Sequence, residues 1–163
     1  MVNHEISQIA NKYLTFFLAK EEYAIDILRV QEIKGWSKVT KIPNTPEYIR
    51  GVINLRGIIV PIIDLRLRFN LECQKEGTMT VIIVVKVLSS SAKERIMGIV
   101  VDAVSDVYDV AENEIKSPPD FGRVISTEFV RGLATVDEKM VIVLDIDRLL
   151  NSNELAIVES IAH

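Results

Sequence analysis

Residues 48–66 are YIRGVINLRGIIVPIIDLR, and this stretch decides the fold of the chain. An apolar, β-branched run lies on each side of Arg56-Gly57, which predicts two strands joined by a turn, since glycine reaches positive φ without steric cost. Pro61 predicts that the second strand is an edge or carries a bulge, because proline donates no ladder hydrogen bond. Asp64 follows where a helix N-cap belongs. The stretch therefore predicts a β-hairpin and then a short helix.

The same pattern occurs a second time. Residues 131–150 align with residues 50–69 without a gap, from an Arg-Gly through a polar turn and an apolar run to a capping aspartate, here Asp145. A fainter pair upstream sets residues 24–33 against residues 98–107. Two copies are too few for a solenoid, so the repeat predicts two small, similar β-units packed as a pair.

The remaining segments extend an all-β body with short helices. Residues 27–33 are too few for periodicity to separate a helical turn from an extended segment. The tail, residues 152–163, predicts a C-terminal helix from the spacing of Leu155, Val158 and Ile161. Further strands are predicted over residues 13–19, 23–26, 39–42, 79–88, 95–104, 106–110, 129–136 and 140–144.

The composition excludes several classes of protein. At 163 residues the chain has the size of one domain or two small lobes, and no apolar run is long enough to span a membrane despite a mean hydropathy of +0.23. A net charge of −4 argues against a nucleic-acid partner, and Arg66, Arg68 and Lys75 are a scatter of positive charge rather than a stripe. Residues 1–11 lack the features of a signal peptide, and Cys73 has no second cysteine to pair with. A cytoplasmic location without membrane insertion is therefore expected.

Catalytic and metal-binding patterns are missing from the sequence. The only histidines, His4 and His163, lie at the two termini, so neither a histidine-based triad nor a histidine zinc site has an internal imidazole. The chain contains no G-x-S-x-G and no C-x-x-C, and Gly51 and Gly57 are not followed by the Lys-Ser or Lys-Thr of a phosphate loop. We therefore expect a protein that is not an enzyme, needs no metal or other cofactor, and works by binding.

A resemblance to a known family runs from about Tyr13 to Asn151, and five segments carry it. They are EYAIDILRVQEI at 22–33, RGVINLRGIIVPIIDLR at 50–66, GIVVD at 98–102, STE at 126–128 and RGL at 131–133. In this order they closely resemble the CheW family of chemotaxis coupling proteins.

The resemblance implies two SH3-like five-stranded β-barrels packed side by side, which agrees with the internal repeat. The CheW-like domain is then expected over residues 12–151, with lobes at roughly 12–70 and 79–150. Strand exchange between the lobes stays open at this point. The C-terminal helix at 152–163 follows the domain.

The resemblance also implies a function and its partners. The chain is expected to be a non-enzymatic adaptor that joins membrane chemoreceptors, the methyl-accepting chemotaxis proteins, to the histidine kinase CheA and controls that kinase in chemosensory arrays. Its implied contacts are the cytoplasmic hairpin tip of the receptor and the regulatory domain of CheA. The protein would be cytoplasmic and recruited to the arrays. A CheW-type coupler of a non-flagellar chemosensory pathway is the alternative, and a β-barrel binding module unrelated to signalling comes third.

Family resemblance assigns receptor binding to residues 30, 32, 56, 57 and 104. Val30 and Val104, which occupy equivalent places in the repeat, would lie in the groove between the barrels that takes the receptor tip; the alternative is a plain core role. Glu32 and Arg56 match charged positions tied to coupling, and we expect them to pair at the rim of the groove, because each ends an apolar run. Gly57 would act through the backbone geometry of its turn.

Other residues are assigned to the kinase contact or to the scaffold. Asp120 and Phe121, in a Pro-Pro-Asp-Phe-Gly loop, are expected at the kinase contact, with packing onto the chain's own barrel as the alternative for Phe121. Gly51 is expected to serve backbone geometry, while Asp64 and Asp145 are expected to cap helices rather than to contact a partner. Trp36 is expected to pack.

Overall fold

Two five-stranded β-sheets form the body of the protein in a computed structural model that describes residues 11–71, 77–89, 93–118 and 128–151. Sheet A has the order β8 (Ala103–Val110), β1 (Asn11–Leu18), β2 (Glu21–Asp26), β10 (Lys139–Leu144), β9 (Val130–Val136). Sheet B has the order β3 (Val30–Gly35), β6 (Val81–Leu88), β7 (Glu94–Val101), β5 (Ile58–Asp64), β4 (Ile49–Leu55). The short helices among these residues are η1 (Ile27–Arg29), α2 (Leu65–Arg68), η2 (Glu112–Glu114) and α3 (Ile146–Leu150). The predicted all-β class with two five-stranded units is confirmed.

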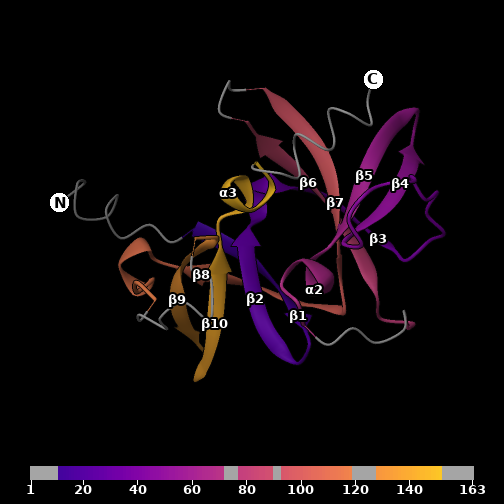
Figure 1. Ribbon diagram of the computed structural model, residues 1–163. Coiled ribbons are helices and arrows are strands. Elements are labelled where there is room, and N and C mark those ends of the chain that lie inside the picture. Colours follow the sequence, from indigo (N-terminus) through magenta and orange to yellow (C-terminus); the bar gives the residue numbers. More distant parts are fainter. Residues whose placement is uncertain (1–10, 72–76, 90–92, 119–127, 152–163) are drawn as a thin grey trace.

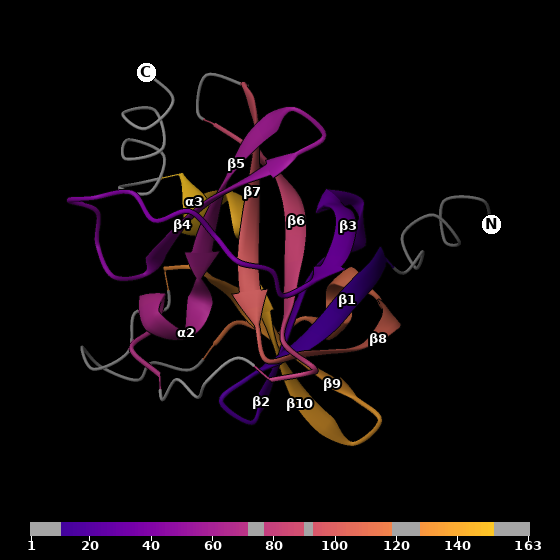
Figure 2. The ribbon, with the colours of Figure 1, turned by 90° about the vertical axis from the view of Figure 1, so that its right-hand side faces the viewer.

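The chain passes from one sheet to the other twice. It leaves sheet A between β2 and β3, through η1, and returns between β7 and β8, where Asp102 alone separates the strands. Strands β3 to β7 therefore lie together on one side of the molecule, and the others gather on the opposite side (Figures 1 and 2). Each sheet takes strands from both 12–70 and 79–150, so neither segment forms a sheet by itself.

The internal repeat relates the two sheets to one another. Each strand of sheet A corresponds to the strand of sheet B whose number differs by five, so β1 corresponds to β6 and β8 to β3. With this correspondence the two sheets have the same strand order. Both sheets join the two parts of the chain through a parallel pair, β10 with β2 and β5 with β7. Each barrel is therefore complete only when both halves of the chain contribute strands to it.

Alternating side chains divide the apolar core into three clusters. Sheet A encloses one cluster that includes Tyr13, Ala24 and Val143, and sheet B encloses another that includes Ile62 and Val84. The third and largest cluster takes side chains from both sheets and from α2 and α3; we call it the shared cluster. Its members include Phe16, Ile25, Ile63, Leu65, Ile83, Val85, Ile99, Leu144 and Leu149. Burial between the sheets therefore holds the two barrels together.

Three two-residue turns connect strand pairs that are adjacent in the chain. Ala19-Lys20, Arg56-Gly57 and Asp137-Glu138 all have positive φ at both positions. This geometry matches the right-handed twist of the flanking strands, so it sets the register of each hairpin. The predicted turn at Arg56-Gly57 is confirmed.

The expectation for Pro61 is only partly met. Strand β5 is interior, between β7 and β4, so it is not an edge. Its parallel pairing with β7 begins at Ile62, however, and the register with β4 shifts between Ile49 and Gly51. Pro61 therefore lies where β7 requires no donor from it, which explains why proline is tolerated inside the sheet.

Two segments that sequence patterns left short or undecided are now defined. Residues 27–33 divide into the helical turn η1 and the start of β3. The strand predicted over 39–42 is reduced to an isolated bridge between Thr40 and Val52. The predicted C-terminal helix at 152–163 lies outside the described residues.

Candidate functional site

Val30 and Val104 lie at the starts of the strands that follow the two crossovers. Val30 opens β3 opposite Val85, and Val104 lies near the start of β8 opposite Phe16. Both side chains are half-buried, and both pack against the shared cluster. They therefore combine a core contact with partial exposure, and their receptor-binding role stays a prediction.

Glu32 and Arg56 form an ion pair that links the two ends of sheet B. Glu32 lies on β3, at one edge of the strand order, and Arg56 lies in the turn after β4, the other edge. The Nη2 of Arg56 donates to Oε1 of Glu32, and this hydrogen bond raises the pKa of the Arg56 guanidinium. The pair therefore connects the two edge strands of sheet B, β3 and β4, while the Arg56 side chain remains 74% exposed.

Exposed apolar side chains lie close in sequence to both residues of this ion pair. Ile33 follows Glu32 and is 43% exposed, and Ile58 and Ile59 follow the turn with 50% and 57% exposed. Gly57 has φ of 88°, its N–H donates to Oδ1 of Asn54 at 2.8 Å, and a Cβ on it would meet nothing within 4 Å. Gly57 is therefore required by the turn conformation rather than by a close neighbour.

Gly51 makes room for a crossing segment. At its φ of 138°, a Cβ would lie 2.1 Å from the carbonyl oxygen of Thr40, which bridges to the next residue of β4. Gly132 repeats the arrangement in β9, where a Cβ would lie 2.5 Å from the carbonyl oxygen of Lys116. The Arg-Gly of both repeats thus marks the place where a connecting segment presses onto a hairpin.

Asp64 both caps α2 and belongs to a buried ionic network. Its side chain accepts from the backbone N–H of Arg66 at 3.0 Å and from Nε and Nη2 of the Arg66 guanidinium at 3.0 and 2.8 Å. Arg50 adds a hydrogen bond at 2.8 Å. Burial alone raises the pKa of Asp64, but the hydrogen bonds and charges of Arg66 and Arg50 outweigh it and hold the pKa below its ordinary value.

Sequence reasoning missed the other members of this network. Arg66 is fully buried, and its Nη1 donates to Oδ1 of Asp102 at 2.8 Å. The sequence predicts Arg66 only as one of several scattered positive charges, and it does not predict the burial or the ionic partners of this residue. The available signal was the repeat alignment, because Arg66 aligns with Asp147 and this helix position carries opposite charges in the two copies.

The remaining assigned residues lie in three different places. Asp145 caps α3 by accepting from the N–H of Arg148 at 3.1 Å. Trp36 packs against the sheet B cluster, with the Arg50 guanidinium 4.8 Å from its ring centroid. Asp120 and Phe121 lie outside the described residues.

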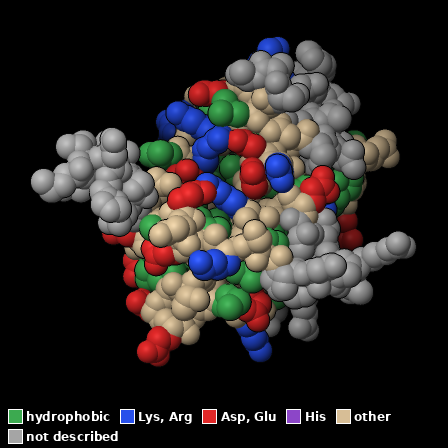
Figure 3. All heavy atoms as spheres, turned by 90° about the vertical axis from the view of Figure 1, so that its left-hand side faces the viewer, with side chains coloured by type: hydrophobic (Ala, Val, Ile, Leu, Met, Phe, Trp, Pro, Cys, Tyr) green, Lys and Arg blue, Asp and Glu red, His purple; other side chains and the backbone are tan. Residues whose placement is uncertain are grey.

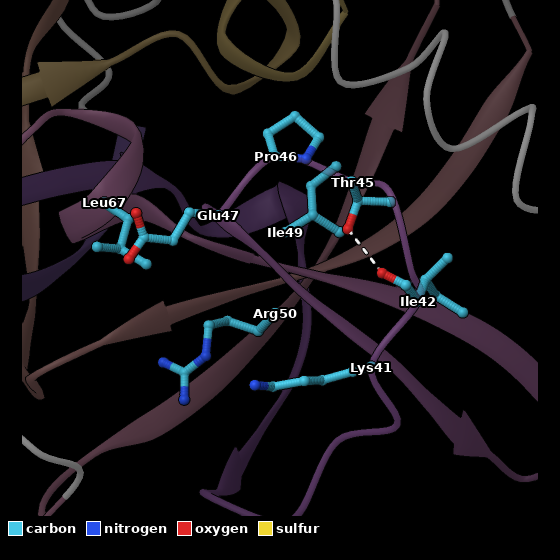
Figure 4. Close-up of a pocket in the computed structure, with 8 residues that line it drawn as sticks. All are labelled: Lys41, Ile42, Thr45, Pro46, Glu47, Ile49, Arg50 and Leu67. Atoms are coloured by element: carbon cyan, nitrogen blue, oxygen red, sulfur yellow. Dashed lines mark hydrogen bonds between the residues drawn. The ribbon is translucent and has the colours of Figure 1, made fainter.

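A surface pocket of about 510 Å³ is lined in part by Arg50, but by none of the residues assigned to the receptor or kinase contact. In Figure 4 the side chains of Lys41 and Arg50 extend in the same direction along one side of it, with the amino group near the guanidinium. Thr45 closes its far side by donating to the carbonyl oxygen of Ile42 at 3.0 Å. Since Arg50 is already bonded to Asp64, the pocket adds no dedicated anion site to the candidate groove.

Two kinds of site, a metal-ligand cluster and a membrane-spanning helix, are absent from the described residues. Nowhere within them do three His, Cys, Asp or Glu side chains gather as metal ligands. No helix among them is long and apolar enough to cross a membrane. The face in Figure 3 mixes acidic and basic side chains with apolar ones instead of presenting a single-sign field. The fold therefore defines an architectural class: two small five-stranded β-barrels joined by a shared apolar cluster.

Comparison with known proteins makes this class specific. The model of the CheW-like domain family matches residues 12–154, and the chain belongs to the CheW family. It is 46% identical over 154 residues to the chemotaxis protein CheW of Klebsiella aerogenes, covering 94% of this chain and 90% of that protein. It is 34% identical to the chemotaxis protein CheW of Rhizobium meliloti, covering 86% and 88%.

A solved structure agrees with the family assignment. The crystal structure of the scaffolding protein TtCheW from Thermoanaerobacter tengcongensis matches with a TM-score of 0.79 and 40% sequence identity, covering 90% of this chain and 96% of that one. The chain is therefore a scaffold or adaptor protein of chemotaxis and not an enzyme.

Proposed function

We propose that the chain couples chemoreceptors, the methyl-accepting chemotaxis proteins, to the histidine kinase CheA and so controls the kinase in chemosensory arrays. Support comes from CheW family membership over residues 12–154 and from relatives named as chemotaxis proteins. These names favour chemotaxis over a non-flagellar pathway as the setting. The protein acts stoichiometrically, without a cofactor, by holding two partners together.

The observation that carries the proposal is the half-burial of Val30 and Val104 against one shared cluster. Repeat-equivalent valines beside both crossovers offer an apolar floor between the barrels, and Glu32 with Arg56 offers a charged rim. An apolar floor with a charged rim suits recognition of helices in a groove. The proposed occupant is the cytoplasmic hairpin tip of a receptor.

For the kinase, we propose a contact with the regulatory domain of CheA that includes Asp120 and Phe121. An aromatic side chain in a polar loop is suited to anchoring a partner, because buried aromatics supply much of the binding energy of interfaces. Binding to both partners recruits the protein from the cytoplasm to the membrane arrays, without insertion into the bilayer.

Substitution of Val30 by aspartate tests the receptor contact. Val30→Asp would place an unpaired carboxylate in the floor of the groove, where desolvation costs several kcal/mol. We expect binding of a receptor hairpin fragment, measured by calorimetry, to be lost, while binding of the CheA regulatory domain persists.

Val107→Asp is the matched control, because Val107 lies on β8 and is 43% exposed. It should leave both affinities unchanged. Circular dichroism decides between a binding role and a core role for Val30. A Val30→Asp protein that is unfolded, or one that is folded and binds the receptor fragment normally, contradicts the assignment.

A further inference from the structure

An ion pair ties each crossover between the sheets to the helix that follows a hairpin. At the first crossover, Arg29 of η1 donates to Asp147 of α3 through Nη1 and Nη2, at 2.9 and 2.5 Å. At the second, Asp102 accepts from Arg66 of α2 at 2.8 Å. The repeat aligns Arg66 with Asp147, so equivalent helix positions hold the two crossovers with opposite charge.

Each aspartate of these pairs also holds the end of a hairpin. Asp147 accepts the backbone N–H of Leu88, at the end of β6, at 2.8 Å. Asp102 accepts the N–H of Ala19, in the turn between β1 and β2, at 2.8 Å. The two ionic contacts therefore correspond to one another in the two repeats, since each joins a crossover, a helix and a hairpin.

The two ion pairs differ in how far their arginine side chains are exposed to water. The Arg66 side chain is fully buried, whereas those of Arg29 and Asp147 are 25% and 27% exposed. Asp102 and Asp147 are similarly exposed, at 31% and 27%, so the difference lies in the arginines. Removing a partner of the fully buried Arg66 leaves a charge in the core without compensation, whereas a pair in which both side chains are partly hydrated opens at much lower cost. The first crossover is thus the one whose attachment can be changed without unfolding the protein.

The other contacts of the first crossover are few: Ile27 packs against the shared cluster, and Nη1 of Arg29 also donates to the carbonyl oxygen of Lys86 at 3.5 Å. None of the residues of η1 is buried, and Leu28 is 81% exposed. Two of its hydrogen bonds are local, from the N–H of Leu28 to Asp26 and from the N–H of Val30 to the carbonyl of Ile27. Segments with few buried contacts open at low free energy. The pair with Asp147 is accordingly a main restraint on the segment that leads directly into Val30.

We propose that Arg29 and Asp147 are positioning residues for partner binding: their ion pair fixes the first crossover and with it the place of Val30 in the groove. Neither residue needs to touch the partner. The effect on affinity rests on the proposed function of Val30 in receptor binding, whereas the effect on local order does not.

Amide hydrogen exchange of the free full-length chain, followed by NMR, tests the local effect. Arg29→Gln and Asp147→Asn each remove one charge, and asparagine retains an oxygen that can accept from Leu88. We expect exchange at residues 28–31 to accelerate about fivefold to tenfold in each variant, since a charge-assisted bidentate contact is lost. The double variant should add little to the singles, and Arg29→Lys should give an intermediate rate.

Calorimetry with a receptor hairpin fragment tests the consequence for binding. The same variants should weaken this binding about fivefold to tenfold, in the order of their exchange rates, and leave binding of the CheA regulatory domain unchanged. Lys12→Gln with Asp109→Asn is the control, because that ion pair joins β1 to β8 with side chains 63% and 62% exposed. The control should change neither exchange at residues 28–31 nor binding.

Two results overturn the proposal. Unchanged exchange at residues 28–31 in Arg29→Gln and Asp147→Asn removes the positioning role. Faster exchange with unchanged receptor affinity separates the crossover from the groove and also contradicts it. A wild-type chain that binds no receptor fragment overturns the proposed function, while the exchange comparison still decides the role of the ion pair in the free protein.

Discussion

Replacing Arg66 by methionine should destabilise the protein strongly at neutral pH. Removing one partner from a buried ion pair costs about 3–5 kcal/mol, because the other charge stays buried without compensation. Asp64 is fully buried and would lose its contacts with the guanidinium, but it keeps Arg50 at 2.8 Å. Asp102 is 31% exposed and can be hydrated. The expected loss is therefore at the lower end, about 3 kcal/mol, since methionine fills most of the vacated volume.

The pH dependence of this loss has a definite sign. The folded-state pKa of Asp64 is below its ordinary value of 3.8, so the ionised carboxylate stabilises the fold above that pH and the contribution is lost as pH falls through the folded pKa. In Arg66→Met the effect of burial, which raises the pKa of Asp64, is opposed only by Arg50 and by the backbone N–H of residue 66. The difference in unfolding free energy between the two proteins should be complete at pH 7 and shrink below about pH 4.

Urea unfolding followed by the fluorescence of the single tryptophan, Trp36, measures both effects. Arg148→Met is the matched control, because the Arg148 side chain is 71% exposed and lies 3.8 Å from Asp145. Its effect should stay within about 0.5 kcal/mol. A loss below about 1 kcal/mol for Arg66→Met, or a loss of the same size at pH 7 and pH 3, would refute the argument from burial.

Three further variants test other parts of the scaffold and its contacts. Gly51→Ala should lower the unfolding free energy by about 3 kcal/mol, since its Cβ would meet a carbonyl oxygen at 2.1 Å, whereas Gly35→Ala, with nothing within 4 Å, should be close to neutral in the same urea titration. Glu32→Arg should weaken receptor binding, and adding Arg56→Glu should restore part of it; a double variant no better than the worse single would show that the pair does not couple. Phe121→Ala should weaken binding of the CheA regulatory domain by about 2 kcal/mol at unchanged thermal stability, and a fall in stability alone would assign Phe121 to packing.

Several local features of this protein could be predicted from the sequence alone. The hairpin and helix of residues 50–69 could be predicted because β-branched runs, a Gly-containing turn and a capping aspartate act over a few neighbouring residues. The repeat then extended the same prediction to residues 131–150. The Glu32–Arg56 pair was predicted as well, because both residues are charged and each ends an apolar run. The absence of internal histidine and of phosphate-loop patterns indicated a binding protein by the same kind of local reasoning.

Only the tertiary structure decided which strands share a sheet. Strand pairing depends on which edges are free when the chain folds back, and an alternating apolar pattern does not specify which strand pairs with it. Sequence similarity grouped the strands by their order along the chain, whereas the two crossovers distribute each half over both sheets. The shared cluster exists because of this distribution, since it requires side chains from both halves on facing sheets.

The fate of individual charges was likewise settled by distant neighbours. Arg66 and Arg68 lie in the same four-residue helix, yet Arg66 is fully buried and Arg68 is half-buried over the rings of Tyr48 and Phe129. A four-residue helix has no periodicity that could separate them. Besides its local partner Asp64, Arg66 pairs with Asp102, which lies far along the chain and comes beside α2 only through the second crossover. Desolvating a guanidinium is tolerable only where carboxylates already surround it, and that condition is set by the assembled fold.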